Sequence, residues 1–396
     1  MTTVESDLLP TEREQEQMAF VEAARSFAQQ EILPNAAKWD REGIYPRDVM
    51  AKLGELGFWG LLVSEEYDGL GLDSQTYLKI IEELAAADAG VAITLAVHNS
   101  LPSHILETHG TKEQKETWLK PMARGEKLAA FCISEADSGS DVAAVSTKAV
   151  RDGNDWILNG TKAWVTSGEV ADLFLIMVRT SDPEPTSRQG LSFFLVPAGT
   201  EGVEPQKAEE KMGLHSSVTN QVALTNVRLS DDFLIGQEGR GFAYAMEGLD
   251  NGRMGVAAQA IGIARAALGY ATRYAAERKQ FDKPIGDFQA IRFMLADMAT
   301  RLEAARALLN DTALKKIRGE NISTQASMAK LFASEMAVFV TNKAVQVFGG
   351  YGYTKEYPVE RLFRDAKVTE IYEGTSEIQR VVIARGLFSE LSKSAR

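Results

Sequence analysis

Apolar residues in the first third of the chain recur every three or four positions, as at Val21, Ala24, Ala28 and Ile32. This spacing places them on one face of a helix. It predicts a series of amphipathic helices between about residue 11 and residue 124.

The pattern changes near Leu128 to short segments rich in β-branched and aromatic residues, bounded by Gly, Asn, Asp and Ser. Such segments are typical of strands joined by turns. We therefore expect antiparallel β-structure in the middle of the chain, with strands at residues 155–165, 173–179, 191–196 and 221–227.

The helical period returns after Gly239. One apolar stripe runs from Met294 to Leu309 and another from Lys330 to Phe348, which favours a bundle of packed helices. The pattern as a whole predicts an α+β multidomain protein, with an N-terminal helical domain at residues 1–126, a middle β domain at 127–237 and a C-terminal helical bundle domain at 238–396.

Composition and charge exclude several classes of protein. The 396 residues carry 43 Lys plus Arg against 55 Asp plus Glu, a net charge of −12, which disfavours a nucleic-acid partner. Cys132 is the single cysteine, so no intramolecular disulfide can form. The longest apolar stretches, such as residues 91–97, are too short to span a membrane, and the N-terminus lacks the order of a signal peptide. We expect a cytoplasmic protein or, in a eukaryote, a processed protein of the mitochondrial matrix.

Familiar site signatures are absent from the sequence. It contains no G-x-G-x-x-G, Walker A, H-E-x-x-H or C-x-x-C motif. The four histidines, His98, His104, His109 and His215, have no metal-binding spacing, so we predict no metal. A carboxylate base working with an organic cofactor is the simplest remaining arrangement for an enzyme.

Glu373 is the candidate base. It stands between Tyr372 and Gly374, just before Ser376 and Gln379, which have the spacing of a capping box. A carboxylate beside an aromatic ring, on a turn freed by glycine, can be desolvated, and desolvation raises its pKa towards a useful range. An ordinary acid in the first turn of a helix is the alternative.

Two further segments could contact a flat cofactor. In the first, small residues at Ser138, Gly139 and Ser140 allow close approach of backbone N–H groups, and Ser134 offers a hydroxyl; a plain turn would have the same composition. In the second, Trp164 could be a stacking wall, although a tryptophan in the hydrophobic core is the commoner case.

Together these segments closely resemble the acyl-CoA dehydrogenase family, flavoproteins that introduce a trans double bond between the α and β carbons of acyl-CoA thioesters. Further matches, in the family's order, are residues 249–253, 277–281 and 346–353. The resemblance implies a C-terminal four-helix bundle, a homotetramer built as a dimer of dimers, FAD as cofactor, an acyl-CoA substrate and electron-transfer flavoprotein as electron acceptor.

The resemblance also implies roles for individual residues around FAD. The residues that match contacts to the flavin or to the neck of the acyl-CoA site are Phe131, Ile133, Ser134, Gly139, Ser140, Trp164, Val165, Thr166, Thr375 and Glu377. Ser134 would lie near the reactive edge of the ring, and Trp164 and Thr166 would flank its other face and edge. Those expected to reach the FAD of a neighbouring subunit are Arg278, Gln280, Phe281, Gln289, Gln346, Val347, Gly349 and Gly350. Glu377 could equally be a helix cap.

For the substrate, the resemblance implies contacts from Ser140, Asp250, Arg253, Tyr372 and Gly374. A surface ion pair is the alternative for Asp250. Some family members carry their base immediately before this arginine.

In this chain that position is Gly252, which has no side chain, so Glu373 is the expected base. Within the family, the sequence as a whole most resembles the short-chain and short branched-chain members. We therefore expect an acyl group of four to six carbons. A flavin-dependent acyl-CoA oxidase of the same fold is one alternative. A non-catalytic relative that binds flavin or nucleic acid is the other.

Overall fold

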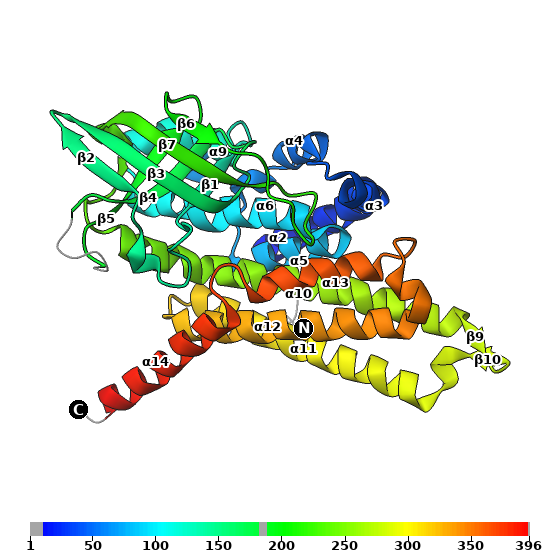
Figure 1. Ribbon diagram of the computed structural model, residues 1–396. Helices are drawn as coiled ribbons and strands as arrows, with labels where there is room; N and C mark the ends of the chain where they lie inside the picture. The colour runs from blue at the N-terminus through cyan, green and yellow to red at the C-terminus, as the bar shows by residue number, and fades with distance from the viewer. Residues whose placement is uncertain (1–10, 182–187, 395–396) are drawn as a thin grey trace.

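The computed structural model describes residues 11–181 and 188–394, in the order helices, strands, helices (Figure 1). The first unit is entirely helical. Its α-helices are α2 (Glu12–Phe27), α3 (Leu33–Glu42), α4 (Arg47–Glu55), α5 (Ser74–Ala87), α6 (Ala89–His98), α7 (His104–His109), α8 (Lys112–Gln114) and α9 (Lys120–Ala123), and its π-helical turns are η1 (Ala28–Ile32), η4 (Asn99–Ser103) and η5 (Lys115–Leu119).

Two aspartates set the boundaries of the helices that lie nearest the centre of the molecule. The Asp73 carboxylate caps α5 by accepting from the Thr76 N–H at 2.7 Å, and Asp88 separates α5 from α6 by accepting from the N–H groups of Gly90 and Val91. Every residue of α6 is buried. A helix that is apolar on all sides belongs in a protein interior, which is where α6 lies.

The described residues form an eight-stranded sheet in the order β6-β7-β3-β2-β4-β5-β8, with β1 beside β4. The prediction of antiparallel structure holds for most neighbours, but β1 and β2 each pair with β4 in parallel. The β2–β3 hairpin brings the chain back to the end of the sheet where β2 began, so that β4 runs in the same direction as β2. The strands are β1 (Ala129–Cys132), β2 (Lys148–Asp152), β3 (Asp155–Thr166), β4 (Leu173–Arg179), β5 (Leu191–Pro197), β6 (Val203–Pro205), β7 (Thr219–Ser230) and β8 (Leu234–Ile235).

Every residue of β4 is buried. Leu173, Leu175 and Met177 pack on one face of the sheet, while Phe174 and Ile176 pack on the other. This alternation is the period-two geometry of a strand. It shows that the sheet has an apolar layer on each face.

The last unit is helical again, and the fold class is as predicted. Its elements are α10 (Gly241–Glu277), the short pair β9 (Lys279–Gln280) and β10 (Lys283–Pro284), α11 (Gln289–Ile317), α12 (Ser323–Phe348), η9 (Gly349–Tyr353), α13 (Val359–Lys367), η10 (Val368–Glu370) and α14 (Ser376–Ser394). Helices α10, α11 and α12 lie side by side, and α14 projects away from them (Figure 1).

Helix α10 packs closely against α5 because of a glycine. A Cβ atom on Gly262 would lie 2.5 Å from the Glu82 carbonyl oxygen. This contact brings the helical N-terminal unit against the C-terminal bundle. In the described part of the chain, no helix has the length and apolar character needed to cross a bilayer.

Candidate active site

Glu373 lies on a tight turn between η10 and α14. Its φ is +51°, and that of Gly374 is +95°. A glutamate rarely adopts a left-handed backbone and needs surrounding contacts to hold it there. Lys330 Nζ donates to the Gly374 carbonyl at 2.7 Å, and Gln379 Nε2 donates to the same carbonyl at 2.9 Å. These two side chains fix the turn.

The capping-box prediction for Ser376 and Gln379 is wrong by one residue. The helix begins at Ser376, and the preceding Thr375 acts as the cap, since its Oγ1 accepts from the Ile378 N–H at 3.3 Å. Gln379 instead reaches back to the carbonyls of Glu373 and Gly374. The side chain expected to cap the helix therefore supports the turn of the candidate base.

The Glu373 carboxylate points at the bare backbone of α10. A Cβ atom on Gly252 would overlap Glu373 Oε2, so a side chain at position 252 and a glutamate at 373 could not share this space. The residue as a whole is partly exposed, but Oε2 is sealed from solvent and has no hydrogen-bond partner. A buried carboxylate oxygen without a partner is costly and indicates a place for a ligand.

Burial raises the pKa of Glu373 to about 7, against the opposing attraction of Lys330 and Arg253. An acid in the first turn of a helix would have a lowered pKa instead. That description fits Glu377, which is exposed and whose pKa is lowered by hydrogen bonds from its own backbone N–H and from Thr375. The two acids of this segment thus have opposite electrostatic environments.

Lys330 was missed by the sequence reasoning. It is fully buried in α12, and its ammonium group donates to the backbone of Gly374 rather than to a carboxylate. Burial lowers the pKa of Lys330 to about 8, while the negative charge of Glu373 acts to raise it. The available signal was a charged residue, Lys330, at the first position of the apolar stripe from 330 to 348.

A buried ion pair fixes the first of the two segments that were predicted to contact a flat cofactor. Lys162 Nζ on β3 donates to the Ile133 carbonyl at 3.0 Å and to Glu135 Oε1 at 2.7 Å. The Glu135 carboxylate also accepts from Ser146 and from the Thr147 N–H. Burial opposes the charge of Glu135, but the attraction of Lys162 and these hydrogen bonds hold its pKa at about 2. Glu135 is therefore ionised at neutral pH, while burial lowers the pKa of Lys162 against the attraction of that carboxylate.

Trp164 is not part of the core. Its side chain is 64% exposed and its φ is +58°, at a register shift between β3 and β7. The next residue, Val165, is 1% exposed and packs inside the sheet, so its backbone is the part left to meet a ligand. The Ala163 N–H donates to the Ser134 carbonyl at 2.8 Å, which joins the two predicted flavin segments side by side.

The remaining residues of these segments lie on the same surface. Phe131 lies in β1 and stacks on Phe193 with ring centroids 5.6 Å apart. Gly139 and Ser140 are exposed, and Ser134 and Thr166 are half-buried. They are positioned to form an open surface rather than a closed interior.

Asp250 and Arg253 form an ion pair within α10, and Ser323 of α12 adds a hydrogen bond to it. Arg253 Nη1 donates to Asp250 Oδ1 at 2.5 Å, and Ser323 Oγ donates to the same oxygen at 3.1 Å. Arg253 is 5% exposed, so the interpretation as a surface ion pair is wrong. Its Nε atom is buried without a partner, which leaves a donor available next to Gly252.

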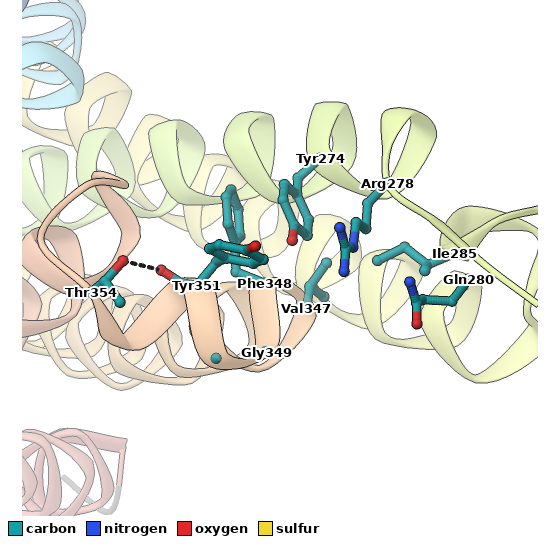
Figure 2. Close-up of a pocket in the computed structure, with 10 residues that line it drawn as sticks. Tyr274, Arg278, Gln280, Ile285, Val347, Phe348, Gly349, Tyr351 and Thr354 are labelled. Carbon is teal, nitrogen blue, oxygen red and sulfur yellow. Dashed lines mark hydrogen bonds between the residues drawn. The ribbon is translucent and has the colours of Figure 1, made fainter.

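A second group of predicted residues surrounds a separate cleft of about 450 Å³ at the far end of α10 (Figure 2). The cleft is lined by Arg278 and by aromatic rings of Tyr274, Phe348 and Tyr351, and the Arg278 guanidinium lies 5.5 Å from the Tyr351 ring centre. The predicted residues that line it are Arg278, Gln280, Val347, Gly349 and Gly350.

The other three predicted members of this group, Phe281, Gln289 and Gln346, are exposed nearby, with Phe281 87% exposed. At 1.5 Å per residue, Arg278 lies about 38 Å along α10 from Arg253. The predicted cofactor residues thus form two distant groups within one chain.

Three family models match nearly the whole chain. They are the acyl-CoA dehydrogenase N-terminal domain at residues 14–126, the middle domain at 130–227 and the C-terminal domain at 239–388. The chain belongs to the acyl-CoA dehydrogenase family. Members of this family are flavoproteins and oxidoreductases, so the resemblance noted in the sequence is confirmed.

The names of individual relatives indicate two kinds of activity, a reductase and a dehydrogenase. A 3-(aryl)acrylate reductase of Clostridium sporogenes is 44% identical over 92% of this chain and 96% of its own length. A short-chain specific acyl-CoA dehydrogenase of Clostridium acetobutylicum is 42% identical over 95% of this chain and 98% of its own. The solved structure of butyryl-CoA dehydrogenase from Megasphaera elsdenii superposes with a TM-score of 0.93 at 41% identity, covering 96% of this chain and 99% of that one.

The geometry around Glu373 predicts the effect of removing the Lys330 charge. Lys330→Met should raise the pKa of Glu373, because a nearby positive charge favours the carboxylate. An opposite charge at close range is worth roughly one to three pH units. The rising limb of the pH profile for acyl-CoA oxidation should move to higher pH by that amount, with activity recovered at alkaline pH. Lys343→Met, on the same helix beside Phe339, is the control; an equal loss at every pH in Lys330→Met would contradict the electrostatic role.

Proposed function

We propose that this protein is a FAD-dependent dehydrogenase of short acyl-CoA thioesters that produces the trans-2-enoyl-CoA. The single observation that carries the proposal is the partnerless Oε2 of Glu373, buried against Gly252 with a pKa of about 7. A general base works best when its pKa is close to the working pH.

Glu373 removes the α-proton of the thioester. The proton moves to the carboxylate as the carbon–carbon double bond forms, and the hydrogen on the β carbon leaves with its electron pair as a hydride. Bound FAD would supply the acceptor for that hydride and carry the two electrons onward. Since Glu373 must be ionised to act, activity should rise with pH through about 7 in the free enzyme.

The α-proton of a thioester is weakly acidic, so negative charge that develops on the carbonyl oxygen needs a donor. The backbone N–H of Glu373 donates to no group in the described part of the chain. Its left-handed turn is held rigidly by Lys330 and Gln379. We assign this N–H as one of the donors to the carbonyl oxygen.

The residues present fit a flavin divided between two copies of the chain. The surface at Ser134, Trp164 and Thr166 and the turn at Glu373 would hold the ring, with exposed Trp164 as its wall. The cleft at Arg278 is too far along α10 to reach the same flavin within one chain. A guanidinium suits paired hydrogen bonds to pyrophosphate oxygens, so we assign Arg278 to the FAD of a partner subunit.

Assembly into a homotetramer built from dimers agrees with this division. Large apolar side chains are exposed where a partner would lie, with Phe281 87% and Tyr353 88% exposed. The projecting helix α14 also exposes Leu387, Phe388 and Leu391. Electron-transfer flavoprotein is the proposed electron acceptor, in keeping with the family.

Glu373→Gln should keep its bound flavin, because the cofactor contacts proposed here are unchanged, and should fail to reduce it. The measurement is bleaching of the yellow absorbance after anaerobic addition of butyryl-CoA, where we expect a loss of at least a thousandfold in rate. Glu356→Gln is the control, since Glu356 is an exposed acid outside the residues assigned to the flavin or the substrate. Bleaching of Glu373→Gln at the normal rate would overturn the proposal.

The proposed sharing of each FAD between two subunits leads to a separate prediction. Arg278→Met should lose flavin on gel filtration, whereas Arg273→Met, which removes an arginine stacked on Tyr270, should retain it. Co-expression of Arg278→Met with Glu373→Gln should restore part of the activity, because a mixed dimer contains one site with both native residues. Absence of any restored activity in isolated mixed oligomers would contradict the division between subunits.

The identity of the electron acceptor that reoxidises the flavin distinguishes a dehydrogenase from an oxidase. After reduction by substrate, the flavin should be reoxidised at least a hundredfold faster by electron-transfer flavoprotein than by air-saturated buffer in stopped flow. Rapid turnover with oxygen alone would identify an acyl-CoA oxidase instead.

A further inference from the structure

A loop of the β region, residues 211–217, lies between the two helical units and leads directly into β7. Asp40 of α3 contacts it together with Arg364 of α13. The Asp40 carboxylate lies 2.8 Å from His215 Nδ1 and accepts from the Arg364 guanidinium at 2.6 and 2.9 Å. Arg364 also donates to the Met212 carbonyl at 3.1 Å. Segments from all three units therefore meet at this loop, which we call the clasp loop.

Leu214, in the middle of the clasp loop, has a strained backbone. Its φ is +52°, in the left-handed region that a leucine rarely adopts. Its side chain is 7% exposed and packs in a hydrophobic cluster built mainly from helices. Its N–H donates to Asp365 Oδ1 of α13 at 2.7 Å. Strain of this kind persists only where the surrounding contacts hold it, and it collects at functional sites.

One end of the clasp loop is bonded to the strand that carries the candidate flavin surface. The Ser167 N–H donates to the Val218 carbonyl at 2.9 Å, and Thr166 pairs with Thr219 where β3 meets β7. Trp164 lies at this same end of β3. A shift of the clasp loop would therefore move the surface that we propose holds the ring.

Asp365 connects the clasp loop to the base. It is 4% exposed, and its helix α13 is followed by η10 and then by the turn of Glu373. The fit is close, because a Cβ atom on Gly213 would lie 2.6 Å from Asp365 Oδ1. Burial raises the pKa of Asp365 to about 7. An amide at position 365 would keep the size of the group and an oxygen that accepts from the Leu214 N–H.

A second path runs from the clasp loop to the base through the interior of the molecule. Ser216 Oγ donates to the carboxylate of Asp88, just before α6. The next residue, Ala89, accepts through its carbonyl from Gln259 Nε2 at 2.8 Å. Gln259 Oε1 accepts in turn from the hydroxyl of Tyr372, the residue before the base. Ser216 is 2% and Gln259 0% exposed, so bulk water does not compete for these hydrogen bonds.

We propose that the clasp loop sets the separation between the ring surface on β3 and the Glu373 carboxylate, with Ser216 and Asp365 as positioning residues. The inference rests on the proposed function, because a reaction that holds one substrate between a ring and a base needs this separation to be fixed. A displacement of about 1 Å can cost roughly a hundredfold in rate. The two hydrogen-bonded paths converge on the turn of Glu373 and oppose such a displacement.

Removing the Ser216 hydroxyl tests the path through α6. In Ser216→Ala, the limiting rate of flavin reduction by butyryl-CoA should fall by roughly tenfold to a hundredfold, as for a misplaced reacting group. The concentration that gives half of this rate should stay nearly the same, because the proposed substrate contacts Asp250 and Arg253 are unchanged. Ser230→Ala is the control. It removes a hydroxyl that donates to Asp232 at 3.0 Å at the opposite end of β7, and it should leave both quantities unchanged.

Two substitutions at Asp365 test the path through α13. Asp365→Asn keeps an acceptor for the Leu214 N–H and should keep the native limiting rate. Asp365→Leu leaves that N–H without a partner and should lower the limiting rate as Ser216→Ala does. Retained flavin and a cooperative unfolding transition show that a variant is folded. If Asp365→Leu does not fold, Ser216→Ala decides the question.

Hydrogen exchange gives a readout that does not depend on turnover. In the flavin-loaded Ser216→Ala protein, the backbone amides of residues 371–373 should exchange roughly tenfold faster than in the native protein, because their turn loses part of its support. The amides of α11, which is not part of either path, should exchange at the native rate. Acceleration at residues 371–373 would link the clasp loop to a turn that lies about 155 residues away in the chain.

The outcomes distinguish this inference from the function beneath it. An unchanged limiting rate in Ser216→Ala, an equal loss in Ser230→Ala, or unchanged exchange at residues 371–373 would overturn the positioning role and leave the dehydrogenase intact. If no acyl-CoA reduces the native flavin, the proposed function itself fails, whereas the exchange experiment still shows whether the clasp loop supports the turn.

Discussion

A carboxylate oxygen with no hydrogen-bond partner lies between the turn at residue 373 and the bare backbone of α10, and the site is arranged around it. Burial without a partner is unfavourable for an ionised acid, and the pKa of Glu373 rises to about 7 as a result. The attraction of Lys330 limits the rise, so that the group can still lose its proton near neutral pH. The proposed role of Glu373 as a base depends on this balance between burial and the nearby charges of Lys330 and Arg253.

The fold provides the two conditions for this balance. Gly252 leaves the room on α10 that Oε2 occupies, and α12 carries Lys330 beneath the turn. The left-handed backbone at Glu373 is held by side chains from two other helical positions, so its cost is met by hydrogen bonds. In the β region, the buried Lys162–Glu135 pair joins β3 to the segment that follows β1.

Regular features of the chain were open to prediction from sequence because they depend on local spacing. The strand expected at 173–179 matches the observed β4, and the helical stripes lie where expected. The parallel pairing of β1 with β4 was missed, since alternation of residues does not reveal the direction of a neighbouring strand. The capping residue was misplaced from Thr375 to Ser376 because one residue of offset gives nearly the same pattern.

The support for the site could not be predicted from sequence because it comes from contacts between distant segments. Lys330 and Gly374 are 44 residues apart, and Lys162 and Glu135 are 27 apart. The sequence left Trp164 open between a stacking wall and a core residue, and its exposure occurs at a local register shift between β3 and β7 that sequence does not reveal. The resemblance to a family suggested which residues belong to the candidate site. The packing shows which contacts hold those residues in place.

The proposed role of Glu373 is tested most directly by an experimental structure of the flavin-loaded protein with a short, unreactive acyl-CoA analogue. In that structure, a Glu373 carboxylate oxygen should lie about 3–3.5 Å from the α carbon, the separation of a reactive geometry, with the flavin on the opposite face of the thioester. A carboxylate turned away from the α carbon, or a thioester bound elsewhere in the molecule, would contradict it.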